Sequence, residues 1–173
     1  MTGQEVPAWF RHAGEGIVGS CESGQLLVTV SIEKLVDLLD PLHADPWSVG
    51  LVTRDQVTAA LRDGRLRTEN PCWQDSPGAM VDSDAHAERI AWLVRYGWDT
   101  AAEFLQVEVD EYGGIGLEDG HHRLYVLAFL GLDGPIMIEL TGYLDMAEIL
   151  LDVTIPRLPA DYASSSSVLA QAD

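Results

Sequence analysis

Basic residues are scarce in this sequence, and lysine is nearly absent. One lysine and nine arginines stand against 28 acidic residues, so the formal net charge at pH 7 is −18. A protein that binds duplex DNA by displacing counterions needs several cations on one surface. The best candidate cluster, Arg62, Arg65 and Arg67, lies beside Asp63 and Glu69. The charge therefore excludes nonspecific duplex binding as a function and favours solubility.

Cysteine and long apolar runs are also scarce. Cys21 and Cys72 are too few for a disulfide framework or a four-ligand zinc site, so both are interpreted as ordinary thiols. No apolar run approaches the roughly 20 residues that span a bilayer. The opening residues, MTGQEVPAWF, lack the basic start and apolar core of a secretory signal. We therefore expect a cytoplasmic protein without a membrane partner.

The chain does contain enough apolar residues for one packed domain. Of its 173 residues, 47% are hydrophobic, which is sufficient for a core of its own. We expect an irregular, glycine-rich N-terminal segment over residues 1–25 and a folded domain over residues 26–155. Residues 156–173 carry two prolines and a serine run, which predicts a flexible tail.

Strand and helix patterns are interleaved along the folded domain. Apolar, β-branched and alternating stretches predict strands over residues 26–32, 104–109, 115–118 and 135–140. Capping residues and helical periodicity predict helices over residues 31–39, 53–64, 83–99, 121–130 and 143–151. This order predicts an α+β domain in which a small mixed β-sheet is flanked by helices. Residues 41–82 are interpreted as an insertion.

The stretch LEDGHHRLYVLAFLG, residues 117–131, carries the polar residues of greatest chemical interest. The helix that follows the box DGHHR is apolar almost all round, which predicts burial. Its N-terminus still offers unpaired N–H groups and a partial positive charge. Asp119 is positioned to cap it, and Gly120 allows close approach of an external group. With His121, His122 and Arg123 as further donors, the box predicts a phosphate-binding cradle.

Each residue of the box also has a purely structural alternative. Asp119 alone fits a helix cap, and either His121 or His122 alone fits a hydrogen-bonded structural histidine. Arg123 alone fits the donor of a surface ion pair. The joint pattern, placed after a strand and before a buried helix, favours a site over these alternatives.

The segment ERIAWLVRYGWDTAAEFLQVEVDEYGGIGLEDGHHRLYVLAFLGLDGPIMIEL resembles the ParB/sulfiredoxin superfamily. The resemblance covers residues 83–140 well and residues 27–40 weakly, and it implies a ParB/sulfiredoxin-like fold. Partitioning proteins of this superfamily carry a G-E-R-R box and a further DNA-binding domain, for which too few residues follow. Sulfiredoxins carry a cysteine where this chain has His121, which excludes their chemistry. The box DGHHR most resembles that of the free-serine kinases.

The resemblance implies a set of functional residues. In the kinase-like branch the box holds nucleotide phosphates, which here implies Gly120, His121, His122 and Arg123 as nucleotide-binding residues. Asp119 is implied to bind Mg²⁺ or to accept a hydroxyl proton, and His121 and His122 to act as acid or base near neutral pH. The catalytic glutamate of that branch lies upstream of the box, where Glu33 and Asp55 are candidates that also fit solvated helix positions.

We therefore hypothesise an enzyme that binds a nucleotide (ATP, ADP or CTP) with Mg²⁺ and transfers or hydrolyses a phosphoryl group, with a small-molecule acceptor. Two alternatives stay open. One is a nucleotide-sensing module without turnover, working with a protein partner. The other is an acidic interaction protein that imitates DNA or inhibits a DNA-binding protein of a mobile element. The charge argues against a nuclease.

The charge balance predicts that the protein alone does not bind duplex DNA. A polyanion is repelled by a net charge of −18, and no basic stripe offsets it. In a gel-shift assay at about 100 mM salt, random duplex should remain unshifted. Submicromolar binding in that assay would contradict this prediction.

Overall fold

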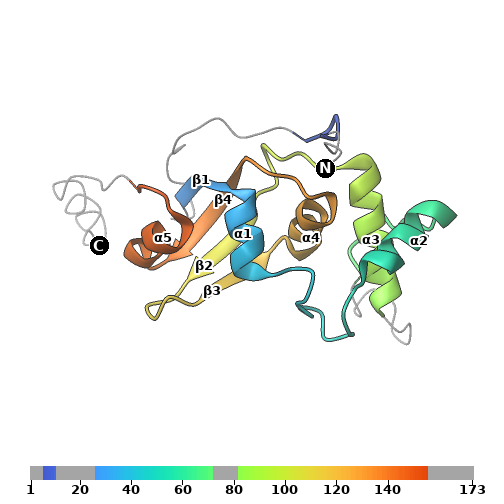
Figure 1. Ribbon diagram of the computed structural model, residues 1–173, viewed down its shortest axis with the longest axis horizontal. Helices are drawn as coiled ribbons and strands as arrows, with labels where there is room; N and C mark the ends of the chain where they lie inside the picture. Colours follow the sequence, from blue (N-terminus) through green and yellow to red (C-terminus); the bar gives the residue numbers. More distant parts are fainter. Residues whose placement is uncertain (1–5, 11–25, 72–81, 156–173) are drawn as a thin grey trace, which may run out of the picture.

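The structure, a computed structural model, describes residues 6–10, 26–71 and 82–155 (Figure 1). Within these residues, the chain forms one sheet of four strands and five helices. No helix in this part of the chain has both the length and the apolar character needed to cross a membrane. The predictions for Cys21, Cys72, the tail 156–173 and most of the N-terminal segment fall outside the described residues.

The sheet is mixed, as the sequence predicts. Its strands lie in the order β1-β4-β2-β3, with β4 antiparallel to β1 and parallel to β2. The hairpin predicted after residue 109 is present, since β2 and β3 pair in antiparallel fashion. The strand bounds are β1 Leu26–Ser31, β2 Leu105–Val109, β3 Ile115–Asp119 and β4 Pro135–Gly142. The expected α+β fold with a small mixed sheet is therefore confirmed.

The helices begin and end close to the predicted residues. Their bounds are α1 Ile32–Leu39, α2 Arg54–Asp63, α3 Ser83–Tyr96, α4 His121–Leu130 and α5 Leu144–Leu151. Ser31 caps α1, and Thr53 with Gln56 forms a capping box at the start of α2. The carboxylate of Asp82 caps α3 by accepting from the Ala85 N–H at 3.0 Å.

Helix α4 is buried on almost all sides, as its apolar sequence predicts. Six of its residues are buried, including Tyr125, whose hydroxyl donates to the Val52 carbonyl at 2.8 Å. At its C-terminal end, Arg54 of α2 donates to the carbonyls of Ala128 and Phe129. Helix α3 packs against α4 and α2 against α3, while α5 lies at the opposite end of the molecule (Figure 1). The N-terminal end of α4 opens into a pocket that its own first turn lines.

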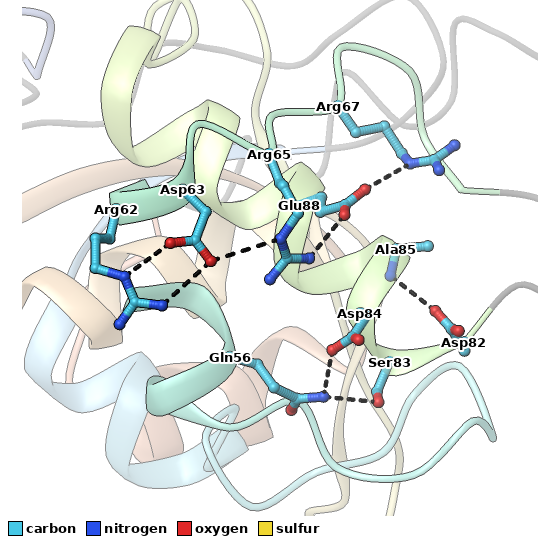
Figure 2. A network of polar contacts seen from close by, with 10 residues as sticks. All are labelled: Gln56, Arg62, Asp63, Arg65, Arg67, Asp82, Ser83, Asp84, Ala85 and Glu88. Carbon is cyan, nitrogen blue, oxygen red and sulfur yellow. Dashed lines mark hydrogen bonds and ion pairs between the residues drawn. The ribbon is translucent and has the colours of Figure 1, made fainter. Parts of the chain in front are cut away.

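The α2–α3 contact is made in part by polar side chains in the first turns of both helices (Figure 2). Besides its part in the capping box, Gln56 donates through Nε2 to the Ser83 hydroxyl and to Asp84, both at 2.9 Å. Since Gln56 lies within residues 41–82, part of the predicted insertion is integrated into the fold.

The arginine cluster singled out in the sequence lies beside the same contact, and each of its members is paired (Figure 2). Arg62 contacts Asp63 at 2.7 Å and Arg65 contacts Glu88 at 2.9 Å. Arg67 lies 3.8 Å from the second oxygen of Glu88. These carboxylates reduce the net positive charge that the cluster can present to a polyanion.

Candidate functional site

The N-terminus of α4 has no side-chain cap. Its cap residue is Gly120, in the left-handed conformation with φ of 100°, and no side chain accepts from the first turn. The expectation that Asp119 caps this helix is wrong. The Asp119 carboxylate instead accepts a hydrogen bond from Arg123 Nη2 at 2.7 Å. The partial positive charge of the helix end is therefore not offset by a capping carboxylate.

Gly120 is required for packing inside the protein. A Cβ at this position would lie 2.5 Å from Cδ2 of Leu105 in β2 and 3.4 Å from the Arg123 guanidinium. Gly120 thus approaches Leu105 closely and also lines the pocket at this end of α4, and the approach of an external group stays a prediction. The contact with Leu105 places the start of α4 against β2 of the sheet.

A pocket of about 490 Å³ opens at this end of α4. Its wall includes the whole DGHHR box, from Asp119 to Arg123, so the structure brings together the residues that the sequence groups. Other polar residues reach it from elsewhere in the chain: Asn70, Arg89, Glu103, Gln106 and Glu139. The pocket is therefore strongly polar and carries charges of both signs.

Arg123 is a cation of the pocket whose side chain is held by two carboxylates. Its side chain is only 13% exposed and lies between two mostly exposed carboxylates, those of Asp119 at 2.7 Å and Glu103 at 3.8 Å. The two carboxylates are therefore solvated, as in a surface ion pair, but the Arg123 side chain is not. A guanidinium held in this way can turn its fork from a carboxylate to a phosphate without large movement.

Arg89 of α3 is a second cation on the pocket wall, and it is not among the residues predicted from the sequence. Its Nη1 donates to the Thr68 carbonyl, and its guanidinium lies 4.9 Å from the centre of the Trp92 ring. Its Nε is buried and has no hydrogen-bond partner among the described residues. Burial lowers the pKa of Arg89, while the charge of Glu103 partly opposes that effect.

The second histidine of the box is joined to a histidine from another helix. Nε2 of His122 lies 2.9 Å from Nδ1 of His86 in α3. The indole of Trp47 stacks over both imidazoles, with ring centres 4.3 Å from His86 and 4.6 Å from His122. His86 is 2% exposed, so the pair is shielded from water on several sides. Neither His86 nor Trp47 was singled out from the sequence.

The pKa is lowered for each of the three histidines at this site, His86, His121 and His122. Burial is the main cause in each case: it lowers the pKa of His86 to about 4 and that of His122 to about 3, and it lowers the pKa of His121. For His122, the positive charges of neighbouring groups add to the effect. Burial thus moves the pKa of both box histidines downward, and their role as acid or base stays a prediction.

His121 also lies at the edge of a second, smaller pocket. This pocket has a volume of about 110 Å³ and is lined mainly by apolar residues of the loop after α1, by Leu117 and by Leu124. Trp47 and His121 line both pockets, so the two adjoin. A polar cavity and a small apolar cavity therefore share one wall.

The two upstream carboxylate candidates lie elsewhere. Glu33 lies on α1 and borders other depressions, and Asp55 is exposed on α2. Neither lines the pocket at α4, where the carboxylates are Asp119, Glu103 and Glu139. Within the described residues, no group of three or more His, Cys, Asp or Glu is arranged to hold a metal ion. The carboxylates fit a Mg²⁺ ion only if a bound phosphate supplies further oxygens.

Comparisons of the chain with protein-family models, with curated proteins and with solved structures find no match.

Two missed residues left a signal in the sequence. His86 lies four residues before Ile90 and next to Ala87, on the apolar face of its helix, so helical spacing alone places this imidazole in the core. Arg89 follows by three residues, which puts it close to the same face. Trp47 left no comparable signal, because it lies in a loop without periodicity.

Gly120→Ala should destabilise the protein strongly, because the new methyl group overlaps Leu105 and the residue keeps a positive φ. The left-handed conformation alone costs about 1–2 kcal/mol for a non-glycine residue. Gly116→Ala in β3 is the matched control, since a Cβ there meets nothing within 4 Å. Urea unfolding followed by circular dichroism measures both. Equal midpoints for the two variants would show that the tight packing at Gly120 is absent.

The neutral histidines predict a loss of stability in mild acid. Their folded pKa values lie below that of an unfolded histidine, so the unfolded chain takes up protons first as the pH falls. Their contribution is intact above about pH 6.5 and is lost progressively toward about pH 4 and below, at about 1.4 kcal/mol per pH unit for each histidine.

Urea unfolding at several values between pH 7 and pH 5 measures this slope. His86→Asn should reduce it, because one of the titrating groups is removed. His43→Asn is the control, since His43 is exposed and pairs only with Asp40. A wild-type free energy of unfolding that stays constant over this range would contradict the prediction.

Proposed function

We propose that the protein binds a nucleotide at the N-terminal end of α4 and transfers or hydrolyses its terminal phosphoryl group. One observation carries the proposal. The uncapped start of a buried helix opens into a pocket whose wall also carries two arginines, Arg123 and Arg89. Free N–H groups and guanidinium donors at one point are what phosphate oxygens require.

The shape of the site supports a nucleotide over a simple anion. The polar pocket, at about 490 Å³, exceeds the needs of a single phosphate and suits a chain of phosphates with a sugar. The apolar pocket beyond Trp47 and His121 suits the flat, weakly polar face of a base. A ligand that is anionic at one end and planar at the other therefore fits both cavities.

The remaining polar groups of the pocket support phosphoryl transfer. In such reactions a protein mainly positions its reactants and neutralises charge. Arg123, Arg89 and the first turn of α4 supply the neutralisation. Mg²⁺ bound together with the phosphates would supply further charge neutralisation, and Asp119 or Glu139 would hold it. The resemblance of the DGHHR box to that of the free-serine kinases points to the same class, with an alcohol as acceptor.

A bound phosphate would also change the state of the histidines. Its negative charge beside His122 would raise the pKa of that imidazole from about 3 toward neutrality. An imidazole that is a poor base in the ligand-free protein thereby becomes a better one once the nucleotide is present. Proton transfer would then depend on ligand binding, and His122 would stay unprotonated until the nucleotide is bound.

Arg123→Ala should weaken nucleotide binding by about one to two powers of ten, because a charge-assisted contact contributes roughly 1.5–3 kcal/mol. Lysine at this position should restore only part of the affinity, since it lacks the planar fork. Calorimetric titration with ATP, ADP and CTP, each with Mg²⁺, measures the effect. Arg62→Ala is the control, because Arg62 pairs with Asp63 and does not line the pocket.

Asp119→Asn distinguishes two roles of the carboxylate in the same titration. If Asp119 only competes with phosphate for Arg123, its loss should tighten binding without Mg²⁺. If it also holds Mg²⁺, affinity in the presence of the ion should fall. Equal affinities of wild type and Arg123→Ala, or no binding by the folded wild type, would overturn the proposal. Tight binding without product over hours would instead identify a nucleotide-sensing module.

A further inference from the structure

The contact between His86 and His122 is an edge-to-edge imidazole pair. The two rings are inclined by only 16°, and their centres are 5.1 Å apart while the facing nitrogens are 2.9 Å apart. Rings stacked face to face would not bring two nitrogens this close at that centre separation. Each ring therefore points one nitrogen at the other in a shared plane, and Trp47 covers that plane.

A neutral imidazole pair of this kind has two proton arrangements. One nitrogen of the facing pair must carry a proton and the other must accept it. If His122 donates from Nε2, its Nδ1 is bare, and His86 accepts at Nδ1 and carries its single ring proton on Nε2. If His86 donates from Nδ1, its Nε2 is bare and His122 carries a proton on Nδ1. In each arrangement one histidine carries a proton on the nitrogen that points away from the other ring. We call this the outer proton, and the two arrangements differ in which histidine carries it.

The surrounding charges differ in sign at the two ends. The charged groups that act on His86 are the carboxylates of Asp45 and Asp82, with a smaller opposing contribution from Arg67. Those that act on His122, besides its partner His86, are Arg89, Arg123 and, when protonated, His121, and both arginines line the same pocket as His122. A proton is favoured beside carboxylates and disfavoured beside guanidinium groups. The outer proton therefore belongs on His86, which leaves Nδ1 of His122 without one.

We propose that His86 is a positioning residue that holds His122 as its Nε2–H tautomer, so that Nδ1 of His122 presents a lone pair to a hydroxyl group of the ligand. The catalytic role of this tautomer rests on the proposed function, whereas the presence of the tautomer does not. His122 then accepts a hydrogen bond in the pocket, in contrast to the expectation that it donates to phosphate. The ligand group that it fits is an alcohol, either the ribose or the acceptor.

The chemistry that follows is a proton transfer coupled to phosphoryl transfer. The acceptor hydroxyl would give its proton to Nδ1 of His122 while its oxygen forms a bond to the terminal phosphorus. The bond from that phosphorus to the bridging oxygen would break, and the leaving nucleotide would keep the electron pair. The proton then leaves His122 for solvent, and the facing hydrogen bond to His86 is kept throughout.

The tautomer can be measured directly by long-range ¹H–¹⁵N correlation spectra of the full, ligand-free chain near pH 7.5. Replacement of His43, His86, His121 and His122 one at a time assigns the signals. The expected result is a proton on Nε2 and a bare Nδ1 in both His86 and His122. A protonated Nδ1 in His122, or a doubly protonated ring, would overturn the proposal, and neither result depends on nucleotide binding.

Two variants of His86 test its positioning role. Asparagine can still accept from Nε2 of His122, so His86→Asn should keep the tautomer. Leucine cannot accept, so His86→Leu should allow both tautomers to appear. With a nucleotide and acceptor that turn over, His86→Leu should lower kcat by up to about 100-fold and leave the nucleotide Kd unchanged, and asparagine should rescue kcat. If His86→Leu leaves kcat unchanged while Arg123→Ala loses nucleotide binding, the positioning role of His86 is overturned. The proposed nucleotide site would stand in that case.

Discussion

The burial of α4 is the constraint on which the rest of the structure depends. A helix that is apolar almost all round must be covered on every side, and the sheet, α1 and α3 provide that cover. Its C-terminal carbonyls are satisfied by Arg54 from α2. Its N-terminal N–H groups lack such a partner, so the polar chemistry of the molecule gathers at that end. The site is thus a consequence of how the core is closed.

Most of the fold could be predicted because local signals agree with the tertiary structure. Thr53 with Gln56, Gly64, Gly97 and Gly131 mark helix ends through backbone chemistry that acts over a few residues. The bounds of α4 follow from the same logic, since Gly120 and Gly131 flank an unbroken apolar run. Strand order was not predicted in detail, because pairing between β1 and β4 depends on residues more than a hundred positions apart.

The site could be predicted only in part. The DGHHR box is contiguous, so its residues stay together in any fold that keeps the helix. The roles within it were less predictable: Asp119 can cap the helix or pair with Arg123, and only the packed geometry shows that it pairs. The pKa values of the histidines also depend on burial, which no single residue of the sequence encodes. His86 and Arg89 lie on α3, and only tertiary packing brings them next to the DGHHR box.

Contacts from α2 and α3 hold both ends of α4, and they have a consequence for local unfolding. Arg54 holds the last carbonyls of α4, and His86 holds His122 in its first turn. Residues 41–71 and α3 therefore cannot detach as a peripheral unit without exposing the central helix. Local opening of this region and global unfolding should be one cooperative event, so the amides of α2, α3 and α4 should exchange with deuterium at similar rates.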